Sequence, residues 1–340
     1  MRMYTDSSRL IGDGPAAAAR MAEDGYLWLP GLLPRGVVTE LHETLARHVQ
    51  GAGWLKADSD PSECLAEPDG ACVDPEPGYL KVIEGFNRVL DYNRLSHHPR
   101  LLGFLEAMLG EPVLVHPKPL PRNIFPSLEE YTTPAHQDYP NIQGTEAVYT
   151  AWIPLHDCAP DVGGLQVAAG SHHSGVYEFG IGNGAGGIDI LERFEGRWVG
   201  GPMEAGDVLL FHSLTVHKGI PNRSAKLRMS IDARYQPVSE PFNPMNADRP
   251  YGLPESWEAM YAMWPDTPEA DALKFYWERY PLTLKTFDPQ WFERRDQLGF
   301  ELGRRGDPRA RSVLLRIAMR DADAAKRALA HALLEDLEGR

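Results

Sequence analysis

Apolar residues repeat at intervals of three and four in the first part of this chain, which predicts amphipathic helices. The clearest stripe lies in residues 35–49: Val38, Leu41, Leu45 and Val49. A short apolar run at 26–30 precedes it and reads as a strand, and residues 88–110 predict further helix. Residues 1–112 are therefore expected to form helices and one early strand that pack on the rest of the protein.

The pattern changes from residue 113 onward. Short runs rich in β-forming residues alternate with Gly, Pro and Asn, at 113–115, 147–155, 164–168, 207–211 and 227–235. Several short strands separated by turn residues are typical of a sandwich or a barrel. We predict a mainly β core over residues 113–240, with helices as additions.

Residues 241–340 are predicted to be a helical extension of a single catalytic domain. Two short amphipathic helices are expected between Arg309 and Leu337. Their apolar sides either cover the sheet or form a subunit contact in a homo-oligomer.

Two loops have the composition of segments that border binding sites. Residues 51–79 are rich in Gly, Pro, Asp and Glu without periodicity, as in a lid or a disordered loop. Residues 180–187 contain five glycines but no surrounding βαβ unit, which argues against a dinucleotide site. We expect a flexible loop there, over the active site.

Composition excludes some classes of partner. The 34 Lys and Arg residues are outnumbered by 48 Asp and Glu, giving a net charge of −14. Nucleic acids and anionic membranes bind clustered positive charge, so neither is an expected partner. Three scattered cysteines predict reduced thiols, and neither a signal peptide nor a membrane span is apparent. These features favour a cytoplasmic protein with a small-molecule substrate.

The candidate chemistry centres on His136-Gln137-Asp138. If this segment is a strand, residues 136 and 138 point to the same face, about 6.6 Å apart. A second histidine from another strand would complete a two-histidine, one-carboxylate face. That arrangement suits Fe(II) with open positions for a 2-oxo acid and O₂. The distal ligand could be His212 or His217, since both follow the apolar strand 208–211.

Arg228 favours His217 as the distal ligand. A hairpin turning at Asn222-Arg223 would place positions 217 and 228 opposite each other, with Cβ atoms about 5 Å apart. The planar guanidinium would then bind the free carboxylate of a chelated diacid through two charge-assisted hydrogen bonds.

Polar residues alternate with apolar ones beyond Arg228, so one face of this strand carries Ser230, Asp232 and Arg234. That face lies either outside or in a polar pocket; in a pocket, Arg234 becomes a candidate for substrate or metal-site contact. Lys118, Arg122 and Tyr139 flank the His-x-Asp segment and are further substrate-binding candidates.

Taken together, these motifs resemble the phytanoyl-CoA dioxygenase (PhyH-like) family of 2-oxoglutarate oxygenases. The resemblance covers roughly residues 20–240. It is carried by Asp24-Gly25-Tyr26, Pro134 to Asp138, Thr150-Ala151-Trp152, Gly163 to Val167, Ala169 to His172, Gly206 to Phe211, His217, Asn222, Ser224 and Arg228.

The resemblance implies a double-stranded β-helix, a jelly-roll or cupin-like core with helices packed outside. It implies that His136, Asp138 and His217 hold Fe(II), and that Arg228 binds 2-oxoglutarate beside Trp152. Where some relatives place a hydroxyl two residues after the distal histidine, this chain has Gly219. Ser230 or Thr150 could supply that hydroxyl.

The expected activity is oxidation of a small molecule by O₂, mainly hydroxylation, with release of succinate and CO₂. Secondary metabolism is one setting for such chemistry. Two alternatives remain open: a cupin-like Zn or Mn isomerase or hydrolase, and a non-catalytic binding protein of the same fold.

Overall fold

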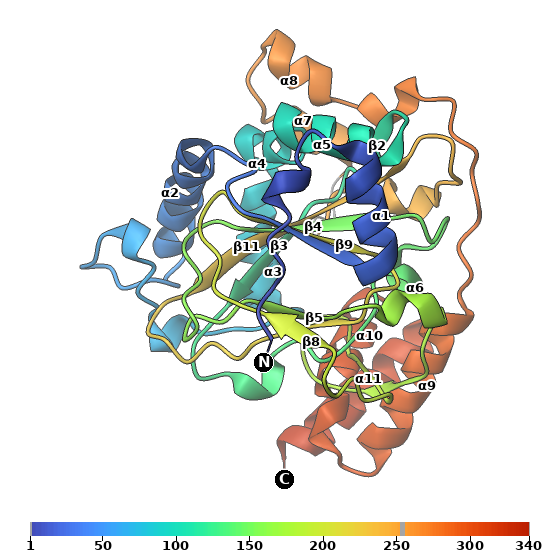
Figure 1. The fold of residues 1–340 in the computed structure, drawn as a ribbon. Helices are drawn as coiled ribbons and strands as arrows, with labels where there is room; N and C mark the ends of the chain where they lie inside the picture. The colour runs from blue at the N-terminus through green and yellow to red at the C-terminus, as the bar shows by residue number, and fades with distance from the viewer. Residues whose placement is uncertain (1, 252–255, 340) are drawn as a thin grey trace.

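The computed structural model describes residues 2–251 and 256–339, and its core is an antiparallel six-stranded sheet (Figure 1). The sheet runs in the order β1 (Tyr26–Leu29), β9 (Val208–His212), β4 (Tyr149–Pro154), β11 (Arg228–Pro237) and β2 (Val113–Val115). β3 (Leu120–Ile124) also pairs with β11. The predicted early strand and the strand runs at 113–115, 147–155, 207–211 and 227–235 are confirmed.

A second sheet of three strands closes the other side of the barrel. It contains β10 (His217–Gly219), β5 (Leu165–Ala168) and β8 (Trp198–Gly200), in that order. A separate hairpin joins β6 (Phe179–Ile181) to β7 (Ile188–Ile190). The pairings between these strands are antiparallel, and the double-stranded β-helix expected from the sequence is confirmed.

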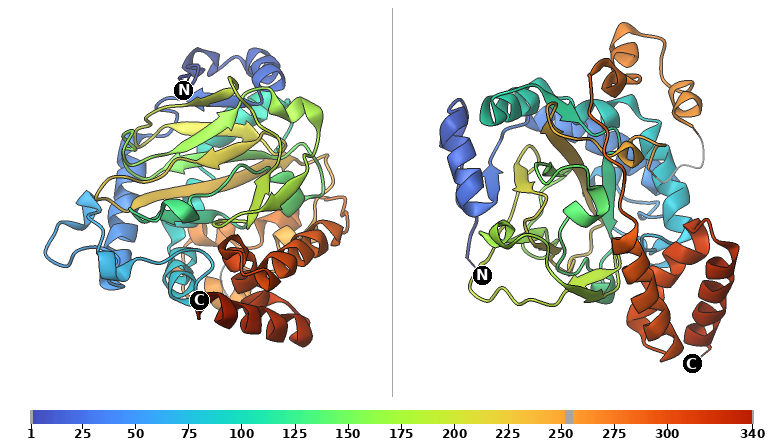
Figure 2. Two further views of the ribbon diagram at one scale, coloured as in Figure 1. Left: turned by 90° about the horizontal axis from the view of Figure 1, so that it is seen from below. Right: turned by 90° about the vertical axis from the view of Figure 1, so that its right-hand side faces the viewer.

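N-terminal helices cover the outer face of the larger sheet (Figures 1 and 2). They are α1 (Gly14–Asp24), α2 (Arg35–Gly51), α3 (Pro77–Asn87), α4 (Leu90–Leu95) and α5 (Pro99–Leu109). The stripe predicted for residues 35–49 is buried in α2. Met229, Ile231 and Ala233 of β11 belong to the same apolar core, so the polar residues between them face the inside of the barrel.

The C-terminal part is helical, as predicted. α7 (Trp257–Tyr261) contributes Trp257 and Tyr261 to an aromatic cluster, and α8 (Pro268–Leu273) packs against it through Ala270. α9 (Gln290–Arg304), α10 (Arg311–Arg320) and α11 (Ala324–Glu338) form a compact bundle beside the barrel (Figure 2). This bundle packs against the β6–β7 hairpin, with Phe179 and Trp291 in ring contact at 4.1 Å.

Several local predictions differ from the structure. The His-x-Asp segment is not a regular strand: His136 makes one isolated bridge to His217, and Asp138 has helical backbone angles at the start of α6 (Tyr139–Ile142). Residues 180–187 end β6 and form its turn rather than an independent loop. α3 begins inside the segment that was predicted to be a loop.

Short 3-10 turns connect these elements at Ser8–Leu10, Pro61–Glu63, Pro68–Gly70, Glu129–Tyr131, Ser171–Ser174, Pro244–Asn246, Tyr276–Arg279 and Pro308–Ala310. Among the described residues, none of the helices has the length and apolar character needed to cross a membrane. All three cysteines are free thiols, as expected.

Candidate metal centre and adjoining pocket

A two-way backbone bridge brings His136 and His217 together. Each residue donates its N–H to the carbonyl of the other, both at 2.9 Å. The imidazole rings consequently lie with centroids 4.1 Å apart. The backbone N–H of Asp138 donates to Ser213 O at 3.0 Å, which holds the carboxylate near both rings.

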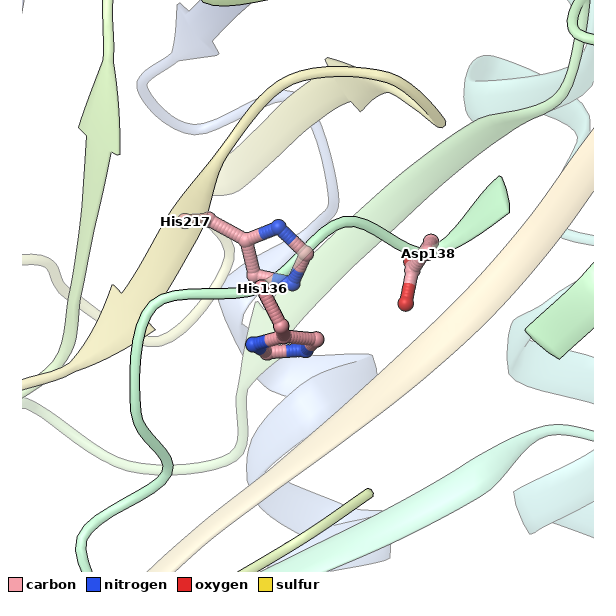
Figure 3. Close-up of side chains that lie close together, drawn as sticks. All are labelled: His136, Asp138 and His217. Carbon is pink, nitrogen blue, oxygen red and sulfur yellow. The ribbon is translucent and has the colours of Figure 1, made fainter. Parts of the chain in front are cut away.

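Ligand atoms of His136, Asp138 and His217 all lie within 4.8 Å of one another (Figure 3). The three side chains are buried, with 6%, 4% and 5% exposure. His212 lies elsewhere, in ring contact with Tyr149 and His172, so His217 is the histidine that faces His136. Strand position alone did not decide between His212 and His217. In the fold, His217 faces His136, whereas His212 points toward Tyr149 and His172.

Backbone carbonyls fix the histidine tautomers. His136 Nδ1 lies 2.9 Å from Pro134 O, and His217 Nδ1 lies 3.1 Å from Thr215 O. Because a carbonyl can only accept, each Nδ1 carries the proton and each Nε2 keeps its lone pair. A hydrogen bond on the far ring nitrogen is the usual way in which proteins orient metal-binding histidines.

Two side chains hold the Asp138 carboxylate. Thr150 Oγ1 donates to Oδ2 at 2.6 Å, and an Arg234 N–H donates to Oδ1 at 3.3 Å. Burial alone would raise the pKa of Asp138, but Arg234 and the two histidines lower it below its ordinary value. Burial lowers the pKa of His136 to about 3. A carboxylate with neutral imidazoles is the protonation state that binds a metal ion.

This donor set fits ferrous iron. Two imidazole nitrogens and one carboxylate oxygen form the facial set that suits non-haem Fe(II) and leaves coordination positions open. A structural zinc site would normally have four protein ligands, and the group found among the described residues has three.

Arg228 lies in the same cavity as His136 and His217, but the predicted strand pairing is not what places it there. The expected hairpin between positions 217 and 228 is wrong, since His217 pairs with Val167 in the smaller sheet. Arg228 pairs with Ile124 in the larger sheet. The two residues meet because the two sheets face each other across the barrel. Both line one pocket with His136 and Trp152.

Arg228 is a buried cation without a carboxylate partner among the described residues. It is 3% exposed; one of its N–H groups donates to Gly164 O at 2.9 Å, and Nε has no partner there. Burial lowers the pKa of its guanidinium. Trp152 Nε1, in the same pocket, is also buried without a partner. These unpaired donors fit the free carboxylate of a chelated 2-oxo diacid.

The remaining candidates from the sequence lie at different distances from the cavity. Arg122 lines it, but its Nε donates to Asp232 at 2.7 Å. Lys118 forms an ion pair with Asp248 and donates to Met245 O, and neither it nor Tyr139 lines the pocket. Ser230 is buried and donates to Arg122 O at 3.4 Å.

Both segments that were predicted to border a binding site contribute to the pocket. Residues 51–79 supply Cys72 to Asp74 and Tyr79, and residues 180–187 supply Gly184 and Ala185. Sequence reasoning did not find Tyr131 or Asn123 as pocket residues. Asn123, 3% exposed, lines the pocket with both side-chain polar atoms unpartnered in the described part of the chain. Only tertiary contacts bring these two residues to the pocket, so no local pattern could reveal them.

Buried histidines, a carboxylate and an unpaired guanidinium in a jelly-roll define the class of oxygenases that use non-haem iron and a 2-oxo acid. The family model "Phytanoyl-CoA dioxygenase (PhyH)" matches residues 21–230. The chain belongs to this family, and it is a 2-oxoglutarate-dependent non-haem iron oxygenase.

Curated relatives share about a third of the aligned sequence. The 1-deoxypentalenic acid 11-beta-hydroxylase of Streptomyces exfoliatus is 34% identical over 252 residues, covering 69% of this chain and 86% of the relative. The enzyme of the same name from Streptomyces arenae is 33% identical with the same coverage.

Solved structures resemble the fold. The epimerase SnoN, in complex with Fe³⁺, alpha-ketoglutarate and nogalamycin RO, has a TM-score of 0.50 and 22% identity, covering 70% of this chain and 89% of its own. The non-haem monooxygenase ThoJ has a TM-score of 0.50 and 19% identity, covering 83% and 98%.

Proposed function

We propose that this enzyme hydroxylates a small, largely apolar organic molecule, with His136, Asp138 and His217 as the iron ligands and Arg228 as the residue that binds 2-oxoglutarate. The observation that carries the proposal is the buried Arg228, unpaired among the described residues, in one pocket with the two histidines. The curated Streptomyces relatives are named as hydroxylases of an organic acid, which supports the reaction type. Secondary metabolism is the proposed setting.

Charge balance distinguishes Arg228 from Arg122 as the binding group for the co-substrate. Burial alone would lower the pKa of Arg122, but Asp232 raises it above its ordinary value. Arg122 is therefore already paired, whereas Arg228 gains a carboxylate only when a diacid enters. A bidentate Arg–carboxylate pair also sets the direction in which the diacid lies.

The protein's own residues orient the reactants and keep water out. Iron and 2-oxoglutarate, when bound, would supply the oxidising chemistry with O₂ as the oxidant: one oxygen atom would enter the substrate and the other succinate, which leaves with CO₂. Thr150 and Arg234 hold Asp138 in place, and Pro134 O and Thr215 O hold the imidazoles.

The rest of the pocket is mostly apolar and matches the proposed substrate class. Apolar and aromatic side chains lie on its walls: Val73, Tyr79, Ile124, Phe125, Leu128, Tyr131 and Leu165. Asn123 also reaches the pocket, at the edge of the sheet, but it lies opposite Met229, whose side chain packs under the N-terminal helices, so its amide is not proposed as a substrate contact.

The direct test is 2-oxoglutarate binding to the iron-loaded protein, measured by titration calorimetry. Arg228→Ala should weaken binding by roughly 10- to 100-fold, the value of a charge-assisted hydrogen bond. Arg197→Ala, an exposed arginine in a nearby loop, should leave the affinity unchanged. Unchanged binding in Arg228→Ala would overturn the assignment of this residue.

The Asp138→Ala variant, compared with the wild type, distinguishes an iron oxygenase from a Zn or Mn isomerase or hydrolase and from a non-catalytic binding protein. Stoichiometric Fe(II) binding and succinate formation should both disappear in this variant. A protein that binds Fe(II) equally well without Asp138, or a wild type that never forms succinate from 2-oxoglutarate, would contradict the proposal.

A further inference from the structure

The outer wall of the pocket consists of three segments that are far apart in the sequence. Cys72 to Asp74 come from the loop before α3, Tyr131 and Thr133 from the segment before the metal site, and Gly184 and Ala185 from the β6–β7 turn. None of them belongs to the two main sheets. Something outside the barrel must therefore fix their positions relative to one another.

The N-terminal half of α10 contacts all three segments. Arg311 forms an ion pair with Glu76 at 2.9 Å and donates to Tyr131 Oη at 3.3 Å. Ser312 Oγ accepts the Gly184 N–H at 2.9 Å. Each contact comes from a residue at the start of this one helix.

The close approach of α10 also restricts the β6–β7 turn. A Cβ added to Gly187 would lie 2.5 Å from Val313 Cγ2, and the Gly187 backbone has a φ of +71°. Only glycine combines this backbone conformation with so short a distance to a helix. The turn is therefore shaped by α10 as well as by its own strands.

Arg316 begins a chain of charges that reaches the floor of the pocket. It forms an ion pair with Asp74 at 3.0 Å; Asp74 lies 3.9 Å from Arg122, and Arg122 donates to Asp232 of β11 at 2.7 Å. All four side chains are less than a fifth exposed. Charges in such a dry network interact more strongly than in water, which couples α10 to Arg122 and Asp232 at the substrate end of the pocket.

α10 is packed into the helical bundle that it forms with α9 and α11. Val313, Leu314 and Ile317 are buried in the core of the α9–α11 bundle. The bundle is fixed to the barrel through Trp291 of α9, which contacts Phe179 of β6. The family match ends at residue 230, so this bundle is an addition outside the matched region.

We propose that α10 defines the substrate-binding wall of the enzyme, with Arg311 and Arg316 as positioning residues that select the substrate by fixing the three loops. The selected class is a compact apolar body that packs against Val73, Leu128 and Tyr131. This inference rests on the proposed function, because it assigns the substrate end of the same site. Arg311 and Arg316 touch neither the iron ligands nor Arg228 among the described residues.

The test uses hydrogen exchange of the full-length, iron-free protein, followed by mass spectrometry. In Arg316→Ala, amides of residues 73–80 should exchange roughly tenfold faster, while β9 and β11 keep wild-type protection. Arg311→Ala should act on the same segment, and Arg316→Lys should retain part of the protection. Arg304→Ala, an exposed arginine on α9, is the matched control.

Alkylation of the cysteines by N-ethylmaleimide separates local opening from general destabilisation. Cys72 lines the pocket, whereas Cys64 and Cys158 are buried elsewhere. In Arg316→Ala only Cys72 should react faster. Equal acceleration of all three thiols, or wild-type exchange at 73–80 in both the Arg316→Ala and Arg311→Ala variants, would overturn the proposal.

Binding of 2-oxoglutarate distinguishes a failure of the proposed function from a failure of the proposed role of α10. The iron-loaded Arg316→Ala protein should bind it as the wild type does, because Arg228 keeps its position. Failure of the wild type to bind 2-oxoglutarate would remove the proposed function, whereas the exchange and alkylation results would still report on the wall. A large loss of 2-oxoglutarate affinity in Arg316→Ala would contradict a role confined to the substrate end.

Discussion

Thr150 and Arg234 lie directly opposite each other on β4 and β11, and each binds a different oxygen of Asp138. From the sequence, Thr150 is a candidate to supply a hydroxyl to the co-substrate, but in the structure its hydroxyl donates to the Asp138 carboxylate. This contact restricts the rotation of the Asp138 side chain, so the carboxylate is oriented before a metal ion arrives.

Replacing Thr150 should therefore weaken iron binding without removing a ligand. Thr150→Val keeps the shape but loses the 2.6 Å hydrogen bond, and we expect Fe(II) affinity to fall by about 10- to 100-fold. Thr150→Ser retains a hydroxyl and should stay close to wild type. Equilibrium Fe(II) titration under anaerobic conditions measures both. Equal affinity in all three proteins would show that this hydrogen bond does not orient the ligand.

Among single residues, those that belong to a recognisable sequence motif could be predicted as candidate metal ligands. His136 and Asp138 are close in sequence, and His217 follows a recognisable strand. Asn123 was given no role and Thr150 was given a different one, because an ordinary polar residue on a strand shows its partner only in three dimensions. Arg228 was selected through a hairpin that does not exist, and the family resemblance supported it independently.

The two faces of β11 contact different parts of the protein. Its apolar residues pack under the N-terminal helices, and its polar residues point into the barrel, where Arg228 and Asp232 line the pocket. The alternation predicted from the sequence is therefore present, with the polar face inside. In most soluble sheets the polar face is in contact with water, and here the pocket takes that place.

The two faces predict different responses to substitution. Ile231 is fully buried, so Ile231→Ala should lower the free energy of unfolding by about 3 kcal/mol through lost burial and a residual cavity. Ser230→Ala, the neighbour on the opposite face, removes one hydroxyl with a 3.4 Å hydrogen bond and should cost less than about 1 kcal/mol. Urea denaturation followed by circular dichroism measures both. Similar losses would mean that the faces are not separated as described.

Elements with a clear apolar pattern were predicted well, and elements without one were not. α2 has a repeating apolar stripe and β9 is a continuous apolar run, so the burial of both is visible in the sequence. β3 contains Pro121 and Arg122 and pairs at a sheet edge, where proline is tolerated, so its pattern is weak. β10 has only three residues, too few to show which sheet it joins.

Over the whole molecule, the least predictable feature is the contact of the C-terminal helices with the loop before α3 and with the β6–β7 hairpin. α10 and α11 were expected from their apolar stripes, with the sheet or another subunit as their partner. Together with α9 they pack on the β6–β7 hairpin, and α10 meets the loop at 72–76. These contacts depend on one aromatic pair and on single charged pairs, which have no period and no local signal.

Because Asp74 can be protonated, the contact between α10 and the loop at 72–76 should depend on pH. Burial alone would raise its pKa, but Arg316 and Arg122 lower it below the ordinary value of an aspartate. A carboxyl group with a lowered pKa in the folded state contributes stability that is complete above its unfolded pKa, about 4, and lost as the pH falls through the folded value. Acidification should therefore weaken the attachment of α10 to the pocket wall.

Asp74→Asn removes this titration while keeping the size of the side chain. Between about pH 5 and about pH 3, the wild type should lose more unfolding free energy than Asp74→Asn, because only the wild type must protonate a carboxylate that binds two guanidinium groups. At neutral pH the variant should be the less stable protein, since Arg316 has lost its charged partner, and this difference should shrink as the pH falls. Urea denaturation across this pH range gives both comparisons, with Asp58→Asn on an exposed loop as the control. Parallel pH profiles for the wild type and Asp74→Asn would mean that Asp74 is not held by these two cations, and the coupling of the C-terminal bundle to the pocket would then depend on Arg311 and Ser312 alone.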